Sequence, residues 1–470
     1  MYANHSFWLD ETTSTWVIDK GFSEIFARSW VNNLSPLYYS IIYTSKLIFG
    51  YSEFSLRIPG MLIGVLTIPL AYLLAYKLSK SNKLSLLAAF LISVDHSMIF
   101  YSLELRPYAF VIFFVLLHLY IFLFLLEKTN KIFYAIILGV LTTVLILLHY
   151  TTATIFLVEL TIIIYDWGRV KVFWENRYAL LIYILVPFIL LLPFFSHIMY
   201  LFENNDVLGS FVGKEKIESV FWIHSQLSTY ILFPLMVGIF FTEFFTKKKY
   251  KIVDKSFLLI FFIAWYFVPA LFHWLLTKMN FASIYLYRYL AWTIPAAIIG
   301  SVVLIDIYKS KWAKILTIAL LVFFSSKIYI STCLLLINPG AQLADKLMRY
   351  ELTNSYSDSF GWENAVDIIN NSALEPAQIF VRSGLVEGRI QKGNEKAQNI
   401  YRDYLLSPVN SIYKLNSTNL LKSEPINSIE EIPKSMTNYI VVGWIDSKHF
   451  NNAIVLNANK DAEISVLYFK

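Results

Sequence analysis

Two adjacent carboxylates, Asp10 and Glu11, follow the aromatic residues Phe7 and Trp8 just before a very apolar stretch of the chain. An acid held at a membrane surface can accept the proton of a hydroxyl group and so act as a general base. An acid in such a place can also do no more than cap a short helix. The dipeptide alone leaves both interpretations open, and the segments around it must decide between them.

A second charged segment, from Tyr101 to Phe110, contains Glu104, Arg106 and Tyr108 between two apolar runs. Arginine can bind a phosphate through two parallel hydrogen bonds. Charges of both signs in so short a turn at a membrane surface favour a substrate-binding role for this segment. The alternatives are a structural ion pair between Glu104 and Arg106, or anchoring of both side chains at the interface.

Further ionisable residues lie within or at the ends of apolar runs. Asp95 and His96 stand inside one run, where such groups are usually functional, although a hydrogen-bonded pair facing a water-filled cavity would also explain them. His149 ends another run, where an interfacial histidine is the alternative to a substrate contact. Arg57 and Arg288 each stand at the start of an apolar run. Each could contact a phosphate or could anchor the span by snorkelling to the interface. No HExxH, CxxC or glycine-rich nucleotide motif occurs in the sequence, which assigns no cofactor and leaves a divalent metal open.

The composition points to a bilayer as the environment of most of the chain. Hydrophobic residues make up 57% of the 470 residues and charged residues only 15%, against about 25% in a typical soluble chain. A membrane-spanning helix needs about 17–25 apolar residues. Ten segments fit, near 58–76, 84–101, 107–126, 132–149, 152–167, 178–200, 227–245, 256–276, 288–306 and 315–337. The lone cysteine, Cys333, excludes a disulfide within one chain.

The links between these spans alternate in charge, which sets the orientation by the positive-inside rule. One set of links is rich in cations: Lys77, Lys80, Lys83, Lys128, Lys131, Arg169, Lys171, Arg177, Lys247, Lys248, Lys249, Lys251, Lys255, Lys309, Lys311 and Lys314. The opposite set contains Arg106, Lys214, Lys216, Lys278 and Arg288. We therefore expect the first set in the cytoplasm, and residues 1–56 and the polar tail on the outer face of the cell membrane. The net charge of +6 is modest, and its distribution favours topology signals over a nucleic-acid partner.

The tail, residues 338–470, is polar, unlike the rest of the chain, and has no apolar run long enough to span a membrane. Residues 362–370 have a helical stripe, and 378–381 and 439–442 have the pattern of buried strands. We expect a small C-terminal extracytoplasmic α/β domain. The predicted organisation is thus a first outer loop with the acidic pair at 1–56, a transmembrane helical domain at 57–337 and the outer domain at 338–470.

Several motifs occur in a recognisable order across residues 5–300. The acidic pair is followed by SPLYY at 35–39, SLRIPG at 55–60, SLELRPYAF at 102–110, HYTT at 149–152 and YRYLAWTIP at 287–295. This ordered set resembles the membrane glycosyltransferases of the C-type (GT-C) fold. The nearest groups are the protein O-mannosyltransferases, the lipid A aminoarabinose transferases and the RgtA/B/C/D-like enzymes of glycosyltransferase family 39. The resemblance implies a mainly α, polytopic fold.

The resemblance also implies a reaction and roles for particular residues. In that family a sugar is taken from a polyprenyl-phosphate carrier at the outer leaflet, and an acid in the first outer loop acts as the base. Asp10 matches this acid and Glu11 its neighbour, while Glu104 and Arg106 match the charged turn. Arg57 and Arg288 match basic positions near the carrier phosphate. The expected reaction is an inverting transfer to a hydroxyl of a lipid, glycan or protein acceptor.

Rival interpretations remain from other classes. A transporter or a flippase for lipid-linked sugars would also have many spans and buried charges, but such proteins commonly have paired repeats that this sequence lacks. An oligosaccharide polymerase would share the topology and transfer whole glycans. Because the resembling family has a span before its acidic pair, we also expect the natural gene to encode an apolar span upstream of Met1.

Overall fold

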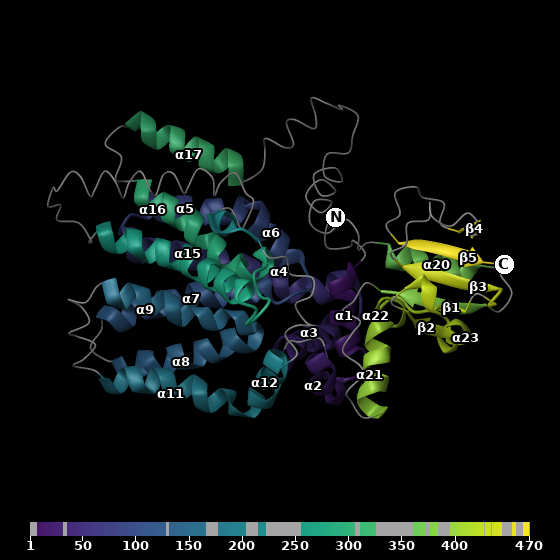
Figure 1. Ribbon diagram of the computed structural model, residues 1–470. Helices are drawn as coiled ribbons and strands as arrows, with labels where there is room; N and C mark the ends of the chain where they lie inside the picture. The colour runs from purple at the N-terminus through teal and green to yellow at the C-terminus, as the bar shows by residue number, and fades with distance from the viewer. Residues whose placement is uncertain are drawn as a thin grey trace. The chain divides into compact units, whose positions relative to one another are not determined.

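Most of the chain is described by the structure, a computed structural model (Figure 1). The described residues are 7–31, 35–127, 131–165, 177–203, 215–221, 255–305, 311–325, 361–372, 377–383, 395–426, 428–433, 435–443, 454–456 and 464–469. The expected span at 227–245 lies outside these residues. The chain divides into two units, of which the first combines Met1–Pro59 with Cys333–Lys470 and the second is Gly60–Thr332.

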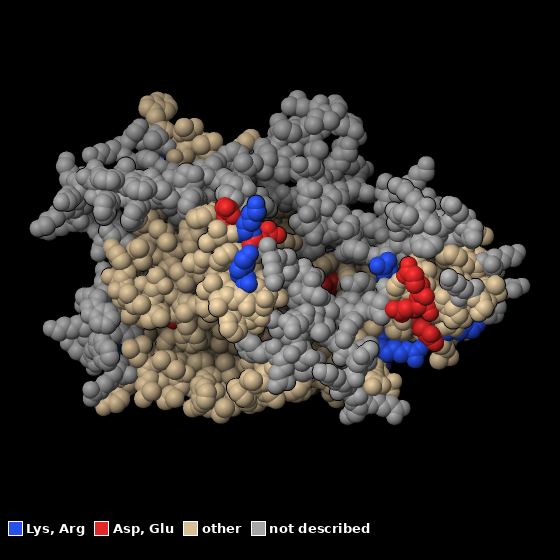
Figure 2. Space-filling view, viewed as in Figure 1, with Lys and Arg blue, Asp and Glu red and all other residues tan. Residues whose placement is uncertain are grey.

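The second unit is built from apolar helices. Its helices are the continuation of α4 (Glu53–Ser79), then α5 (Asn82–Val94), α6 (His96–Leu103), α7 (Tyr108–Glu127), α8 (Lys131–Leu148), α9 (Ile155–Tyr165), α11 (Arg177–Leu191), α12 (Phe195–Glu203), α15 (Lys255–Lys278), α16 (Ile294–Leu304) and α17 (Lys311–Ser325). The 3-10 segments are η2 (Tyr150–Thr154), η3 (Leu192–Phe194), η4 (Ile217–Phe221) and η5 (Tyr287–Thr293). On the face drawn in Figure 2, most of the described surface of this unit is uncharged, and its blue and red side chains gather in one group.

Six segments of the described residues are long and apolar enough to cross a membrane. They are Glu53–Ser79, Tyr108–Leu126, Lys131–Leu148, Tyr178–Met199, Phe257–Lys278 and Tyr287–Leu304, and the bent pair α5–α6 adds a seventh if it is counted as one span. These seven match expected spans. Two further expected spans, 152–167 and 315–337, correspond to the shorter apolar helices Tyr150–Tyr165 and Lys314–Phe323. The predicted polytopic helical fold is confirmed, and the total of ten spans stays a prediction.

Small residues allow close packing of α4 against the segment that ends in the charged turn. A Cβ added at Gly60 would lie 2.8 Å from the carbonyl oxygen of Ser102, and one added at Gly64 would lie 2.6 Å from the Ser102 Cβ. Helices in membranes pack through such small residues because apolar surface alone gives no driving force between them in lipid. The glycine of the SLRIPG motif thereby fixes the approach of α4 to the end of α6.

The first unit joins helices from the beginning of the chain to an α/β layer from its end. Its helices are α1 (Leu9–Asp19), α2 (Phe22–Val31), α3 (Pro36–Phe49), α20 (Trp362–Asn371), α21 (Glu395–Leu405), α22 (Ser407–Asn410) and α23 (Ser417–Leu421), with the 3-10 turn η9 (Ile429–Glu431). The strands are β1 (Gln378–Arg382), β2 (Ser423–Pro425), β3 (Tyr439–Gly443), β4 (Ile454–Val455) and β5 (Ser465–Phe469). The expected helix at 362–370 and strands at 378–381 and 439–442 are found as α20, β1 and β3.

The sheet has the strand order β2-β1-β3-β5-β4 (Figure 1). Strand β1 pairs in parallel with β2 and β3, and β5 pairs antiparallel with β3 and β4. The stripe predicted on α20, namely Trp362, Ala365, Val366 and Ile369, is fully buried. Phe380, Val441 and Leu467 pack together in one hydrophobic cluster on the sheet. The tail thus supplies its own apolar core.

Helix α1 is buried over most of its length although its sequence is rich in hydroxyls. The hydroxyl groups satisfy themselves within the helix: Thr12 donates to the Leu9 carbonyl at 2.7 Å, and Thr13 donates to the Asp10 carbonyl at 2.8 Å. Such bonds to the preceding turn remove the cost of burying a hydroxyl. The result is a short helix that can sit inside the first unit while its first turn carries the acidic pair.

Candidate active site

The two carboxylates of the acidic pair have different surroundings in the first turn of α1. Glu11 is 1% exposed, and its carboxylate accepts hydrogen bonds from Arg57 Nε at 3.2 Å and Arg57 Nη2 at 2.7 Å. Its Oε2 also accepts from the backbone N–H of Trp8 at 3.3 Å, which is one half of a capping box. Asp10 is only partly buried. Asp10 is therefore the more accessible acid of the pair.

Arg57 is fixed on two sides. Its guanidinium binds Glu11, and its face covers the Phe7 ring at 4.6 Å from the ring centroid. A bidentate carboxylate and an aromatic face together define both the plane and the position of a guanidinium. The structure thus brings Arg57 together with Glu11, and a direct contact of Arg57 with the carrier phosphate stays a prediction.

In the second unit, the predicted residues Tyr108, His149 and Arg288 come together from three elements. The ring of Tyr108, at the start of α7, lies 6.0 Å from the ring of His149, which follows α8. His149 lies 4.6 Å from the ring of Tyr289 in η5, and the Arg288 guanidinium lies 5.7 Å from the centroid of Tyr289. These elements are far apart in the sequence and meet at the ends of apolar segments.

The charged turn between α6 and α7 is buried as well. Glu104 is 6% exposed and Arg106 is 8% exposed. The Arg106 N–H donates to the Glu104 carbonyl at 2.8 Å, so the backbone makes a tight turn at these two residues. Tyr101, at the end of α6, reaches the same group of rings, since its ring lies 5.4 Å from that of Tyr108. We call Tyr101, Glu104, Arg106, Tyr108, His149, Arg288 and Tyr289 the arginine–tyrosine cluster.

The arginine–tyrosine cluster is suited to an anion. Burial lowers the pKa of His149 to about 3, and the positive charges of Arg106 and Arg288 act in the same direction. His149 is therefore neutral at pH 7. The hydroxyl of Tyr108 is buried and has no hydrogen-bond partner among the described residues. A buried hydroxyl is costly without a partner, so a ligand oxygen or a water at this position would relieve the cost.

Asp95 and His96 mark a bend in the chain between α5 and α6. The Asp95 Oδ1 accepts hydrogen bonds from the N–H groups of Ser97 at 3.0 Å and Met98 at 3.2 Å, so Asp95 is the N-cap of α6. The two helices are bent by 54° at this residue. Asp95 is 1% exposed, while His96 is half-buried and opens α6. Their predicted substrate contacts remain predictions, and the structure adds a local role for Asp95.

Another buried polar group lies inside the spans and was not predicted from the sequence. His118 Nε2 in α7 lies 2.8 Å from Glu159 Oε1 in α9, and the Tyr183 hydroxyl in α11 donates to Glu159 Oε2. Each of these residues stands alone in an apolar run, which is a signal that an ionisable side chain needs a partner. Tyr101 comes directly before SLELRPYAF and Tyr289 lies within YRYLAWTIP, and only their place beside charged residues distinguishes them from the other tyrosines of the chain.

Apart from Asp95 and His96 at the bend between α5 and α6, the predicted site residues thus occur in two groups, one in each unit. The first unit holds the acidic pair with Arg57, and the second holds the arginine–tyrosine cluster. Among the residues that the structure describes, no group of three or more His, Cys, Asp and Glu side chains could hold a metal ion.

Comparison with known proteins agrees with this fold. A family model for dolichyl-phosphate-mannose-protein mannosyltransferase matches residues 33–197. The chain is similar to ArnT from Cupriavidus metallidurans bound to undecaprenyl phosphate, with a TM-score of 0.53 and 14% identity over 99% of this chain and 94% of that chain. The apo state of the same protein gives a TM-score of 0.51 and 14% identity at the same coverage. No curated protein matches the sequence. These findings confirm the predicted resemblance to the C-type membrane glycosyltransferases.

Proposed function

We propose that this chain is a membrane glycosyltransferase that moves a sugar from a polyprenyl-phosphate carrier to a hydroxyl of a lipid, glycan or protein acceptor. The charge distribution of the links supports the outer face of the cell membrane as the side on which the reaction takes place. The observation that carries the proposal is the arginine–tyrosine cluster, with two guanidinium groups at the ends of spans and a buried Tyr108 hydroxyl that has no hydrogen-bond partner in the part of the chain that the structure describes. The fold of the chain is similar to that of a protein solved with undecaprenyl phosphate bound, which supports a lipid-linked donor.

In the proposed reaction, Asp10 accepts the proton of the acceptor hydroxyl while the hydroxyl oxygen attacks the anomeric carbon. The bond between that carbon and the phosphate oxygen breaks, and polyprenyl phosphate leaves with inversion at the anomeric carbon. General-base assistance is worth about 10²–10⁴ in rate. Glu11 keeps Arg57 in place beside the base and does not itself accept the proton, because its carboxylate is already engaged by Arg57.

The arginine–tyrosine cluster would bind the donor phosphate. Arg106 and Arg288 neutralise the charge that grows on the leaving phosphate, and loss of one such contact typically costs about 10²–10³ in rate. The Tyr108 hydroxyl donates a hydrogen bond to a phosphate oxygen, and the neutral His149 ring packs against Tyr108. A polyprenyl tail explains why these polar groups lie at the ends of spans, since the tail stays in lipid while the phosphate meets the interface.

The test is sugar transfer by the purified protein from a panel of polyprenyl-phosphate sugars. We expect transfer from at least one donor, and a loss of about 10²–10⁴ in the Asp10→Asn variant. The control is Asp367→Asn, which removes an exposed carboxylate on α20 and should keep wild-type turnover. Wild-type turnover in Asp10→Asn would exclude this residue as the base. Movement of the lipid-linked sugar across vesicles without any product would favour a flippase.

A further inference from the structure

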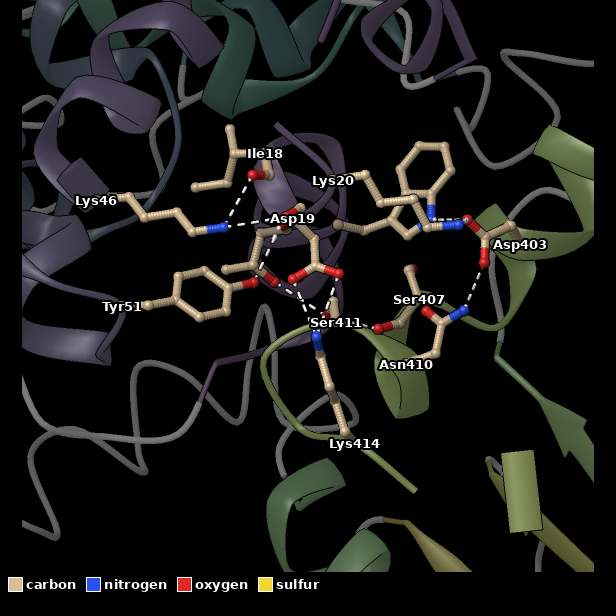
Figure 3. Close-up of polar contacts among 12 residues, drawn as sticks. Ile18, Asp19, Lys20, Lys46, Tyr51, Asp403, Ser407, Asn410, Ser411 and Lys414 are labelled. Atoms are coloured by element: carbon tan, nitrogen blue, oxygen red, sulfur yellow. Dashed lines mark hydrogen bonds and ion pairs between the residues drawn. The ribbon is translucent and has the colours of Figure 1, made fainter. Parts of the chain in front are cut away.

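The C-terminal part of the chain holds the helix that carries the acidic pair. Asp403 of α21 accepts hydrogen bonds from Arg28 Nη2 at 2.6 Å and from Trp16 Nε1 at 3.0 Å. Lys414 forms an ion pair with Asp19 at 3.1 Å. Figure 3 shows Lys414 directed at Asp19. The second half of α1 is thereby attached to α21 and to the segment after α22.

Tyr413, the neighbour of Lys414, reaches the opposite end of α1. Its hydroxyl accepts a hydrogen bond from the Phe7 N–H at 2.7 Å and donates one to Glu53 Oε1. Its ring packs on the Phe7 ring, with 6.4 Å between the centroids. Tyr413 is 8% exposed and Phe7 is fully buried. A residue from the tail therefore contacts the chain just ahead of the acidic turn.

Both hydrogen-bond partners of the Tyr413 hydroxyl, Phe7 and Glu53, belong to segments that position the Arg57–Glu11 pair. Phe7 supplies the ring that the Arg57 guanidinium covers. Glu53 opens α4 and stands four residues before Arg57, so both side chains project from the same face of one helix. The hydroxyl thus ties together the two elements, the segment ahead of α1 and the first turn of α4, whose alignment the bidentate Arg57–Glu11 contact requires.

We propose that Tyr413 is a positioning residue that holds the acidic turn of α1 in place for transfer, through Phe7 on one side and Glu53 and Arg57 on the other. The inference rests on the proposed function, since it assigns the turn a part in the reaction. Tyr413 itself touches no reacting atom in this scheme. A base displaced by about 1 Å can lose about 100-fold in rate, so a residue that fixes the base should show in turnover.

Tyr413→Phe is the informative variant because it keeps the ring on Phe7 and removes the hydroxyl alone. The matched control is Tyr468→Phe on β5, whose hydroxyl donates to Asn438 Oδ1 at 2.8 Å. Both tyrosines belong to the tail, both are 8% exposed, and both lose one tyrosine hydroxyl that takes part in hydrogen bonding. We expect kcat to fall about 10- to 100-fold in Tyr413→Phe with KM within about twofold. Tyr468→Phe should keep the wild-type kcat.

Coupling to Glu11 separates positioning from a general loss of stability. If Tyr413 acts through the Arg57–Glu11 pair, Tyr413→Phe should reduce kcat much less in a Glu11→Gln background than in the wild type. In that background the ion pair that Tyr413 supports is already gone. Independent losses that multiply would overturn the proposal.

Hydrogen exchange measured by mass spectrometry tests the positioning without any substrate. The amides of residues 7–13 should exchange faster in Tyr413→Phe than in Tyr468→Phe and the wild type. Unchanged exchange, or faster exchange with wild-type turnover, would overturn the proposal. If the wild type transfers no sugar from any donor, the proposed function fails. The exchange comparison then still decides whether Tyr413 holds the turn.

Discussion

The buried ion pair between Glu11 and Arg57 allows the structural and the chemical roles of the acidic pair to be separated. The two side chains are 2% and 5% exposed, and two N–H groups of the arginine face one carboxylate. Removal of one partner from such a pair leaves a buried charge unpaired, which typically costs about 3–5 kcal/mol. Glu11→Gln keeps an acceptor for Trp8 and Arg57, so we expect it near the lower end of this range. Glu11→Ala also loses the capping contact, worth about 1 kcal/mol more.

A double replacement by apolar residues should restore stability without restoring transfer. In Glu11→Leu with Arg57→Met, neither charge is left unpaired, and such replacements are often neutral for stability. The thioether introduced by Arg57→Met would also keep a contact with the Phe7 ring. The assay is unfolding of the detergent-solubilised protein in increasing denaturant, together with turnover. We expect Glu11→Leu alone and Arg57→Met alone to be destabilised. The double variant should be close to the wild type in stability and should have low turnover.

Two results would refute this reasoning. Wild-type stability in Glu11→Ala would mean that the ion pair contributes nothing to the fold. Wild-type turnover in the double variant would mean that the pair does not support the acidic turn in the reaction. Asp367→Asn, an exposed change on the tail, serves as the control for both measurements.

Three further predictions concern the arginine–tyrosine cluster. Tyr108→Phe should raise the donor KM about fivefold to tenfold, since one hydrogen bond is worth about 1–1.5 kcal/mol, and should not lower stability, because the hydroxyl has no partner among the described residues; an unchanged KM would contradict a phosphate contact. The pKa of His149 is lowered on folding, so the unfolded chain binds the proton more readily and stability is lost as the pH falls below about 6.5. Between pH 6.5 and pH 5 this loss is about 1.6 kcal/mol, and His149→Gln should remove it in unfolding titrations at the two pH values. Arg106→Ala should reduce turnover about 10²–10³-fold while Lys247→Ala, at an expected cytoplasmic link, should not; equal losses would count against the cluster.

The spans were the part of the fold that the sequence predicts best. A run such as 107–126 is apolar on every side, so it has one stable environment and appears as α7. The break at Asp95 was not predicted, because an aspartate inside an apolar run looks like a costly charge. In the structure the same carboxylate caps α6 and so ends one helix and begins another. Hydropathy measures the cost of such a residue and carries no information on a local hydrogen bond that offsets it.

The candidate site was predictable where its residues are close in the sequence. Glu104, Arg106 and Tyr108 share one short turn, so their proximity follows from the chain itself. The contact of Glu11 with Arg57 spans 46 residues, and that of Phe7 with Tyr413 spans 406. Nothing in a local pattern selects one distant partner from the many tyrosines of this chain, and only the fold brings these groups together.

The His118–Glu159–Tyr183 group shows what a sequence can and cannot say about polar residues in a membrane. Each residue would be costly if it faced lipid, so each must have a partner, and that much follows from the apolar runs around them. The choice of partner depends on which helices are neighbours. In the structure α7, α9 and α11 supply one residue each, and Thr142 of α8 lies 3.4 Å from the Tyr183 hydroxyl. Four helices therefore meet at one hydrogen-bonded group. Since other pairings of these helices would leave a histidine or a glutamate unpaired in lipid, the group favours this arrangement of the spans over its competitors.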